Sequence, residues 1–351
     1  MPVRLSAPSR PPAGFGEAFT AHMITTPFDA EVGWGASQLR PFENLPMSPA
    51  MVGLHYGQVV FEGLKAHRRA DGSLAVFRPE AHARRFQRSA ERLVMPALPE
   101  QTFLQAVDDL VRVDGGELPA DPQLSLYLRP VLFATEECLA LRPARQYLFL
   151  VLAFVTGNFF SDRPEPVSVL ISRNYSRAAP DGTGTAKCAG NYAGAYAAQV
   201  EAARAGCHQV VWLDPVERRW VEEMGGMNIF FVRGSGPSAG IVTPETTSTL
   251  LPGITRDSLL TMARDRGYRV SEEHVSVDQW RDECADGTIT ETFACGTAAL
   301  VTPVGSVRDD QGSWTVGTGA PGPVTIELRQ ALSDIYQGRT PDPHGWMHSV
   351  S

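Results

Sequence analysis

The sequence predicts an α+β protein built from two domains. Segments with strand and helix patterns follow one another without a regular β-α-β order, which favours a mixed sheet over a doubly wound parallel one. The length of 351 residues exceeds what a single ordinary core occupies. The stretch TGNFFSDRPEP, residues 156–166, has the composition of a linker. We therefore expect a first domain over residues 1–155 and a second over 167–351.

The first half of the chain carries two helical patterns followed by two strand patterns. Apolar residues recur at helical spacing from Pro79 to Met95, where Pro79 suits a first helical turn. Residues 101–113 show a second amphipathic helical pattern. Aromatic and branched residues dominate 124–132 and 147–156, which predicts strands. The first domain therefore combines helices with a sheet.

The second half mixes strands and helices irregularly. In chain order we expect a strand at 167–173, a Gly-rich loop at 180–190, an Ala-rich helix at 192–205, a hairpin over 208–223, strands at 228–233 and 240–243, a helix that begins near Thr255, a strand near Ile289 that enters a CGTAA turn, and a closing helix at 324–337. No internal repeat is visible.

The composition is that of a folded globular chain, with 43% hydrophobic and 20% charged residues. The net charge of −8 argues against nucleic-acid binding, which needs a basic surface. The stretch MPVRLSAPSRPPAGF lacks the apolar segment of a secretory signal, and the longest apolar run, 147–155, is about half a membrane span. Five cysteines without a CxxC pair indicate free thiols in a reducing cytoplasm.

The loop DGTGTAKCAGNY, residues 181–192, holds the first candidate for chemistry. It matches neither the P-loop nor the dinucleotide fingerprint, because Lys187 stands where the latter needs its third glycine. By itself the loop also fits a solvated lysine. However, Lys65 and Lys187 are the only lysines in the sequence, and the small neighbours of Lys187 would let a planar ring approach. An amine that loses solvent becomes a nucleophile toward carbonyls.

Two neighbouring glutamates, Glu222 and Glu223, end a predicted strand. Adjacent strand residues point to opposite faces, so at most one of them faces a given site. The pattern fits two exposed side chains. It also fits a carboxylate that pairs with a protonated pyridine nitrogen and makes a cofactor ring an electron sink.

Two segments have the form of anion-binding sites. LPGITRD, residues 251–257, is a turn that leads into a helix start at Thr255, where unpaired amides favour a phosphate. The turn ACGTAA, residues 294–299, offers amides and the Thr297 hydroxyl. Arg85, on the helix after FRP, would neutralise a phosphate. Each feature also fits an ordinary structural role, as a capped helix, a turn or an exposed arginine.

Further candidates lie in a strand and near the C-terminus. Tyr127 and Arg129 are two residues apart in a predicted strand, so their side chains share a face. Aromatic residues in such runs are mostly core residues. His344 and His348 have the spacing of metal ligands, but no third ligand is nearby in the sequence, and we predict no metal site.

The chain resembles the branched-chain aminotransferases, which are fold-type-IV pyridoxal-phosphate enzymes. The resemblance implies a small N-terminal α/β domain and a larger mixed-sheet, pseudo-barrel domain that carries the cofactor lysine. It extends over nearly the whole chain, from about Phe15 to Trp346. The matching segments, in the family's order, are LHYGQVVFEGLKA, FRPEAHARRFQRSAERL, LYLRPVLF, GTAKCAGNYA, VEEMGGMNIFFV, LPGITRDSLL and CGTAALVTPV.

For the cofactor, pyridoxal 5'-phosphate, the resemblance implies a Schiff base on Lys187. That lysine would then carry the proton between the amino acid's α-carbon and the cofactor's C4′. Tyr192 would bind the phenolic oxygen. Glu223, which fits the family's E-x-G-x-x-N frame, would pair with the pyridine nitrogen. The groups implied for the phosphate are Arg85, the amides of Ile254 and Thr255, and Thr297.

For the substrate, the resemblance implies transamination between leucine, isoleucine or valine and 2-oxoglutarate. Because glutamate brings a second carboxylate into an apolar pocket, a cation is needed at the pocket rim, and Arg129 is the candidate. The α-carboxylate would be bound by Tyr127 and the amides of Thr297 and Ala298. The residues implied for the apolar walls are Phe15, Tyr56 and Phe61.

The resemblance also implies an assembly. The family builds each pocket from its own two domains and a loop of the partner subunit. We therefore expect a homodimer in which the loop around Leu139 and Leu141 is donated to the partner.

The chain departs from the family pattern in two respects. Ala299 and Thr302 stand where animal members have a CxxC pair, so no thiol switch of that kind is expected. Gly226 stands where some members have threonine facing the substrate, and its lack of a side chain would widen the pocket.

The main alternative is a related aminotransferase that prefers aromatic or methionine-type substrates, since an apolar pocket discriminates one methylene by only about 1–3 kcal/mol. D-amino-acid transaminases and aminodeoxychorismate lyases are usually shorter and lack the LHYGQ…FEGLKA and YLRP segments. A nucleotide-dependent oxidoreductase would have an incomplete fingerprint. A non-catalytic scaffold would leave Lys187, Glu223 and the anion-binding segments without a role.

Overall fold

The computed structural model describes residues 14–157 and 165–350. The chain forms two compact units: unit 1 is Met1–Phe159, Ala186–Gly190 and Asp334–Ser351, and unit 2 is Phe160–Thr185 and Asn191–Ser333. The sequence predicted a single division of the chain at 156–166. In the structure, the Lys187 segment and the C-terminal residues also belong to unit 1, although they follow that division. Strand pairing explains both returns, because Cys188 bridges Val60 and the last strand joins the sheet of unit 1.

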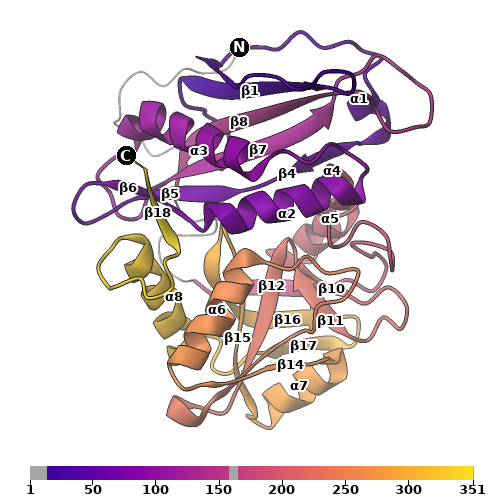
Figure 1. Ribbon diagram of the computed structural model, residues 1–351. Helices are drawn as coiled ribbons and strands as arrows, with labels where there is room; N and C mark the ends of the chain where they lie inside the picture. Colours follow the sequence, from indigo (N-terminus) through magenta and orange to yellow (C-terminus); the bar gives the residue numbers. More distant parts are fainter. Residues whose placement is uncertain (1–13, 158–164, 351) are drawn as a thin grey trace. The chain divides into compact units, whose positions relative to one another are not determined.

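Unit 1 is built on an antiparallel sheet in the order β18-β6-β5-β7-β8-β1-β2, with β3 beside β1 and β4 beside β7 (Figure 1). The long strands β7 and β8 pair from Ser125↔Thr156 to Ala134↔Tyr147. The strand bounds are β1 His22–Asp29, β2 Gly33–Trp34, β3 Gln38–Pro41, β4 Val59–Phe61, β5 Leu64–Arg68, β6 Leu74–Phe77, β7 Ser125–Ala134, β8 Gln146–Thr156 and β18 Met347–Val350.

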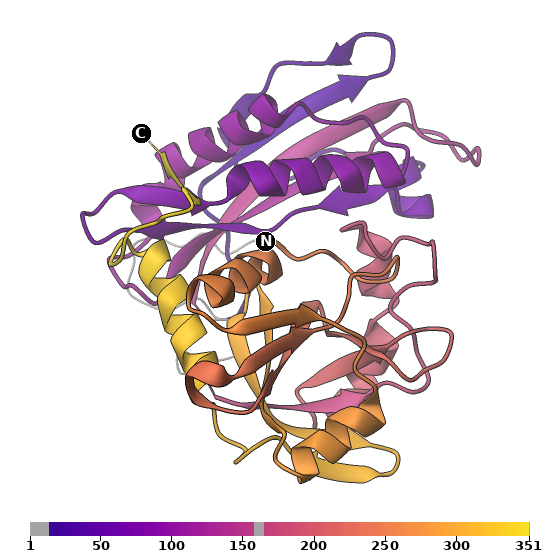
Figure 2. The ribbon, with the colours of Figure 1, turned by 60° about the horizontal axis from the view of Figure 1, so that its bottom comes forward.

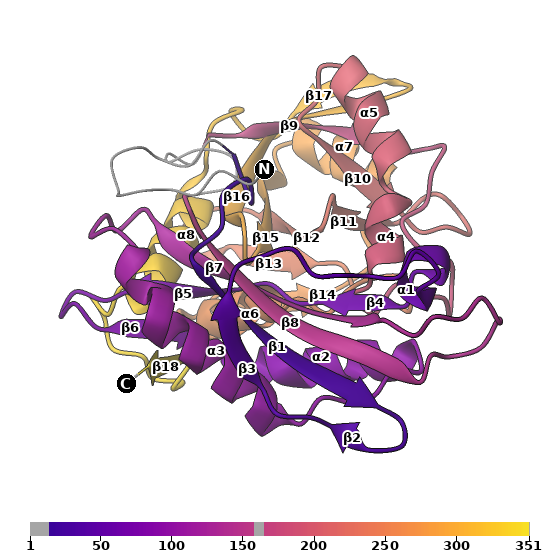
Figure 3. The ribbon, with the colours of Figure 1, turned by 90° about the horizontal axis from the view of Figure 1, so that it is seen from above.

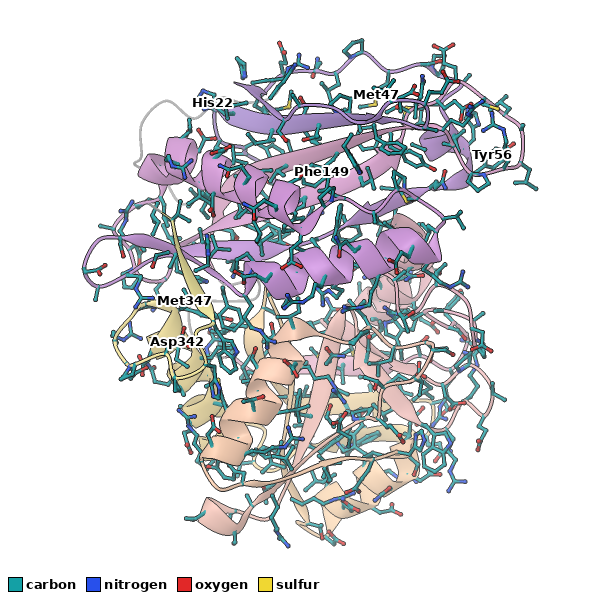
Figure 4. The ribbon with its side chains drawn as sticks, in the orientation of Figure 1. His22, Met47, Tyr56, Phe149, Asp342 and Met347 are labelled. Carbon is teal, nitrogen blue, oxygen red and sulfur yellow. The ribbon has the colours of Figure 1, made fainter. Side chains whose placement is uncertain are left out.

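The helices of unit 1 pack along this sheet, as Figures 1 and 3 show. They are α1 Val52–Tyr56, α2 Pro79–Arg92, α3 Glu100–Asp114 and the 3-10 turn η1 Gly115–Glu117. The core beneath them contains Phe86, Phe103 and Phe149, each fully buried and in mutual ring contact (Figure 4 labels Phe149). The helix expected to reach Met95 ends at Arg92, because Val94 turns into the left-handed region with φ 53°.

Unit 2 is built on a mixed sheet in the order β11-β10-β9-β16-β15-β12-β13-β14, with β17 beside β16. A further pairing of β11 with β12 closes part of this path into a barrel, which confirms the expected mixed-sheet, pseudo-barrel domain. The strands are β9 Val167–Ile171, β10 Gln209–Leu213, β11 Val221–Met224, β12 Met227–Arg233, β13 Gly240–Thr243, β14 Arg269–Glu272, β15 Ile289–Gly296, β16 Leu300–Asp309 and β17 Gly312–Thr315.

Helices lie along the outside of these strands (Figure 2). Their bounds are α4 Ala189–Ala193, α5 Tyr196–Arg204, α6 Ile254–Asp265, α7 Val277–Ala285, α8 Pro323–Tyr336 and the 3-10 turn η2 Gly236–Ser238. Trp280 of α7 is fully buried against Phe231 of β12, with ring centroids 5.2 Å apart. The single helix expected at 192–205 is two helices with a break at Gly194, where a glycine makes a continuous helix less favourable.

Within the described ranges, no helix has the length and apolar character needed to cross a membrane. No cluster of His, Cys, Asp or Glu among the same residues has the form of a metal site.

Candidate active site

Lys187 is fixed through its backbone to two elements of unit 1. Its amide donates to Ser89 Oγ on α2 at 2.9 Å, and its carbonyl accepts from the amide of Phe61 on β4 at 3.0 Å. The next residue, Cys188, bridges Val60. The half-buried Lys187 side chain places Nζ 5.0 Å from the centroid of the Phe61 ring. The Gly-rich loop is therefore not a solvated bend at this point, and Lys187 has a defined position.

The aromatic and basic residues of β7 lie in the same group of contacts. The guanidinium of Arg129 is 4.9 Å from the Phe61 ring and 5.5 Å from the Tyr127 ring, and Arg129 Nη2 donates to the Tyr127 hydroxyl at 3.5 Å. Phe15 stands edge-on to Tyr127 at 4.9 Å. Unit 1 thus contains Lys187 together with a connected group of four residues predicted for the substrate site. They are Phe15, Phe61, Tyr127 and Arg129.

Arg129 retains hydrogen-bonding capacity in this group. Its Nε is buried and has no hydrogen-bond partner among the described residues. A buried N–H without a partner is costly, and a carboxylate is the ligand that best satisfies a guanidinium. This observation supports an anionic substrate group beside Arg129.

Tyr56 is placed differently from the other predicted pocket residues. It is the last residue of α1, is 47% exposed, and donates its hydroxyl to the carbonyl of Leu139 at 2.8 Å. Figure 4 shows it at the periphery of unit 1. Its role as a pocket wall stays a prediction.

Arg85 belongs to a buried cluster on α2 and the end of β4. Its Nε donates to Glu62 Oε1 at 2.6 Å and its Nη2 to Glu62 Oε2 at 2.9 Å. His82 Nδ1 lies 2.8 Å from the same Oε2. Burial would raise the pKa of Glu62, but the charge of Arg85 and the hydrogen bonds from Arg85 and His82 more than offset it and hold that pKa below its usual value. Sequence reasoning identified Arg85 but missed Glu62 and His82, although both stand in segments that match the family.

In unit 2, Glu223 is held at both carboxylate oxygens. Oε1 accepts the amide of Leu251 at 2.7 Å, and Oε2 lies 3.0 Å from Arg177 Nε. The exposed fraction of Glu223 is 2%. A carboxylate this deeply buried needs charged or polar partners, which Arg177 and the amide of Leu251 supply. This arrangement favours Glu223 as the carboxylate that meets a cationic ring nitrogen.

Arg177 is a residue that sequence reasoning missed. Besides its ion pair with Glu223, it donates to the carbonyls of Gly184 and Thr249. It therefore joins the loop that leads to Lys187 with the loop that leads to α6. In the sequence it was one arginine among many. Its position before the AAP segment, residues 178–180, indicates a functional role only when the fold is known.

Glu222 is also buried, in contrast to the exposed alternative. Its Oε1 accepts from the hydroxyls of Thr247 and Thr249. Burial raises the pKa of Glu222. Neighbouring glutamates thus serve different purposes: Glu222 holds the 247–249 loop through hydroxyls, while Glu223 forms an ion pair.

The start of α6 has no side-chain cap. Its N-cap is Gly253, which has no side chain to satisfy the amides of Ile254 and Thr255. A Cβ on Gly253 would lie 2.0 Å from Asn228 Oδ1, while Asn228 Nδ2 donates to the carbonyl of Leu251. The glycine is needed because the turn packs directly on this asparagine.

The remaining predicted residues of unit 2 lie near one another. A Cβ on Gly226 would contact the Tyr192 ring at 3.7 Å, and a Cβ on Gly296 would lie 4.0 Å from the Gly226 carbonyl. Gly296 ends β15 immediately before Thr297 and Ala298, which form the turn into β16. The ladder between β12 and β15 explains this proximity, because Asn228 pairs with Cys295.

These groups fit the cofactor that the resemblance implies. Unit 1 supplies an amine and a guanidinium in Lys187 and Arg85. Unit 2 supplies the uncapped start of α6 for a phosphate and the buried carboxylate of Glu223 for a pyridine nitrogen. A phosphorylated pyridine aldehyde requires an amine for its aldehyde, cationic and amide donors for its phosphate, and a carboxylate for its ring nitrogen.

Comparison with known proteins agrees with this arrangement. Residues 59–307 match the family model described as amino-transferase class IV. The chain is 50% identical to the branched-chain-amino-acid aminotransferase of Mycolicibacterium smegmatis, with 95% of this chain and 91% of that protein covered. It is 52% identical to the probable branched-chain-amino-acid aminotransferase of Streptomyces coelicolor, covering 96% and 92%.

Solved structures give the same result. The branched-chain amino acid aminotransferase of Escherichia coli superposes with a TM-score of 0.77 at 28% identity, covering 95% of this chain and 99% of that one. The branched-chain amino acid aminotransferase of Thermobaculum terrenum, solved in its PLP-bound holo form, has a TM-score of 0.75 at 25% identity, covering 95% and 99%.

Proposed function

This chain belongs to the class IV aminotransferases, and we propose that it transfers the amino group between branched-chain L-amino acids and 2-oxoglutarate with pyridoxal 5'-phosphate as cofactor. The amino acids are leucine, isoleucine and valine. Relatives about 50% identical over most of the chain carry that name, which supports this reading over an aromatic or methionine preference. The observation that carries the proposal is the placement of Lys187 beside Phe61, a ring that Arg129 also contacts while it donates to Tyr127.

The residues that would hold the cofactor are those that the resemblance implies. Lys187 Nζ would bind it covalently, Glu223 would pair with the ring nitrogen, and Tyr192 would bind the phenolic oxygen. The phosphate would be held by Arg85, the amides of Ile254 and Thr255, and Thr297. When bound, pyridoxal phosphate supplies an electron sink that lets a C–H bond at the substrate α-carbon ionise.

The chain's own residues then manage protons and charge. Lys187 Nζ would take the proton from the substrate α-carbon and pass it to C4′ of the cofactor. Its position is set by Ser89 and Phe61 rather than by loop flexibility. Arg177 and the amide of Leu251 hold the Glu223 carboxylate in place, so that it would stabilise a proton on the ring nitrogen.

Substrate recognition combines polar and apolar groups. Tyr127 and the amides of Thr297 and Ala298 would bind the α-carboxylate. Arg129 would bind the second carboxylate of glutamate, for which its buried Nε is suited. The apolar side chain would meet the rings of Phe15, Phe61 and Tyr56, and Gly226, which has no side chain, would leave space for it.

We further propose that the protein works as a homodimer in a reducing cytoplasm. Leu139 and Leu141 are 55% and 89% exposed, and Tyr56 contacts Leu139. Apolar side chains this exposed are suited to burial by a second copy. All five cysteines are free. Leu141→Asp should shift the protein toward monomer in sedimentation, whereas a dimer of unchanged stability would contradict this part of the proposal.

The function is tested by half-reactions of the purified holoenzyme with single amino acids. The visible absorbance of the cofactor should change with leucine, isoleucine, valine and glutamate, and far less with phenylalanine or methionine. A faster change with phenylalanine than with leucine would instead favour the aromatic preference. Borohydride should attach the cofactor to the peptide that contains Lys187. Attachment to Lys65 would overturn the assignment of the lysine.

A further inference from the structure

Unit 1 contains a buried cluster of which the proposed function uses one member only. Glu62, His82 and Arg85 are 0%, 1% and 4% exposed. Glu62 directly follows β4, and His82 and Arg85 stand three residues apart on α2, so they lie on one face of that helix. Arg85 is assigned to the phosphate, whereas Glu62 and His82 have no role so far.

Glu62 binds one edge of the Arg85 guanidinium with both of its oxygens. Arg85 donates from Nε at 2.6 Å and from Nη2 at 2.9 Å. This two-point pairing fixes the plane of the guanidinium as well as its position.

His82 and the Gly63 amide in turn hold Glu62. Gly63 N donates to Oε2 at 3.1 Å, and His82 Nδ1 lies 2.8 Å from the same oxygen. An ionised carboxylate only accepts, so His82 Nδ1 carries the proton. Burial lowers the pKa of His82. The cluster therefore pairs one carboxylate with one guanidinium and a neutral imidazole.

The same two elements hold Lys187. Ser89, one helical turn after Arg85, donates its hydroxyl to the Arg85 carbonyl at 2.9 Å and accepts from the Lys187 amide at 2.9 Å. Phe61, the residue before Glu62, donates to the Lys187 carbonyl at 3.0 Å. The orientation of Arg85 and the position of Lys187 thus depend on one rigid contact between β4 and α2.

We propose that Glu62, held by His82, is a positioning residue that sets the plane of Arg85 for the phosphate group of the cofactor. The proposal rests on the proposed function, in which Arg85 contacts that phosphate. Glu62 itself acts only through Arg85. If Glu62 served the fold alone, its loss would change stability without selecting between phosphorylated and unphosphorylated ligands.

The test compares two probes on the cofactor-free protein. Pyridoxal phosphate and pyridoxal, which lacks the phosphate, are titrated while the absorbance of the bound ligand is followed. Glu62→Gln should weaken pyridoxal phosphate binding by about 10- to 100-fold, the range expected when charge-assisted hydrogen bonds are lost. Pyridoxal binding should stay near the wild-type value. Equal weakening of both probes, or of neither, would overturn the proposal.

The His82 variants give a second comparison in case Glu62→Gln does not fold. His82→Leu should weaken the binding of pyridoxal phosphate selectively, because Glu62 then loses one of its three donors at Oε2. His82→Asn offers an N–H in place of Nδ1 and should restore most of the affinity. Glu100→Gln is the matched control, since Glu100 forms an exposed ion pair with Arg84, next to Arg85 in the chain. It should leave both affinities unchanged.

Arg85→Lys separates this proposal from the proposed function. If Arg85→Lys does not weaken pyridoxal phosphate relative to pyridoxal, the assignment of Arg85 to the phosphate fails. If Arg85→Lys shows that selective loss and Glu62→Gln does not, Arg85 keeps its role and the positioning role of Glu62 is wrong. In the Arg85→Lys background, Glu62→Gln should add less than about twofold, because residues that act through one contact are not additive.

Discussion

Arg177 Nε lies 3.0 Å from Glu223 Oε2, with side chains only 8% and 3% exposed. The same guanidinium donates to Thr249 O at 2.6 Å and to Gly184 O. One side chain therefore connects the carboxylate proposed for the ring nitrogen with the loop before Lys187 and the loop before α6. Lysine has no planar fork with which to make these contacts together.

Arg177→Lys should accordingly lower kcat by about 10- to 100-fold, as expected when a group that orients a site residue is lost. The melting temperature should also fall, because Glu223 loses its fixed partner in the interior. Arg204→Lys, on the exposed surface of α5, is the matched control and should change neither quantity. An unchanged kcat in Arg177→Lys would show that Glu223 needs no such support.

Glu223→Gln should slow proton transfer by about 100-fold, because the amide cannot stabilise a positive ring nitrogen as a carboxylate does. Glu222→Gln should be mild. The pKa of Glu222 is raised by burial, and its partners are hydroxyls, so a neutral side chain is tolerated there. Single-turnover kinetics with leucine measure both effects. The reverse ranking would show that Glu222 is the functional carboxylate.

Arg129→Ala should impair the glutamate half-reaction more than the leucine half-reaction. Glutamate would lose the partner of its second carboxylate, which costs about 1.5–3 kcal/mol or roughly 10- to 100-fold in kcat/KM. Leucine has no such group. The control is Arg145→Ala, since Arg145 is exposed in its pair with Glu31. Equal losses for glutamate and leucine would exclude Arg129 as the rim partner.

Gly63→Ala should raise the KM for all amino-acid substrates. A Cβ at this position would lie 1.8 Å from the Tyr127 hydroxyl, so the ring that is proposed to bind the α-carboxylate must move. Gly116→Ala is the matched control, because a Cβ there meets nothing within 4 Å. The check is steady-state kinetics with leucine and glutamate; a KM that rises for one of them only would argue against α-carboxylate binding by Tyr127.

His67 should make the fold sensitive to acid. Burial, together with the nearby charge of Lys65, lowers the pKa of His67 from 6.5 to about 3. Below pH 6.5 the unfolded chain therefore binds a proton at His67 that the folded chain does not bind. The stabilisation of the fold by neutral His67 is complete above pH 6.5 and is lost as the pH falls toward 3.

His67→Phe removes this titration and retains a ring against Tyr336, whose centroid is 4.4 Å from that of His67. The variant should lose less stability than the wild type between pH 6.5 and about 4.5 in thermal melts, within the window that the His67 pKa shift defines. His274→Gln, at an exposed position, should follow the wild-type curve. Parallel curves for wild type and His67→Phe would contradict the prediction.

The sequence predicted elements with strong local patterns and missed those that exist through pairing. The helices α2 and α3 and the strands β7 and β8 were expected from periodicity alone. The short strand β18 has too few residues to show a period, and it forms because β6 offers an unpaired edge. For the same reason the division of the chain did not include the return of residues 334–351 to unit 1.

The sequence by itself determined the family and the local chemistry of each segment, and led to the proposal of Lys187 as the cofactor lysine, because these depend on residue types in order along the chain. Only the tertiary structure decided which groups meet. Arg177 reaches Glu223 across 46 positions (223 − 177), and Glu62 reaches Arg85 across 23 positions. Such pairs result from the register of strands and the packing of α2. Backbone contacts with Ser89 and Phe61, both distant in the sequence, likewise determine where Lys187 stands.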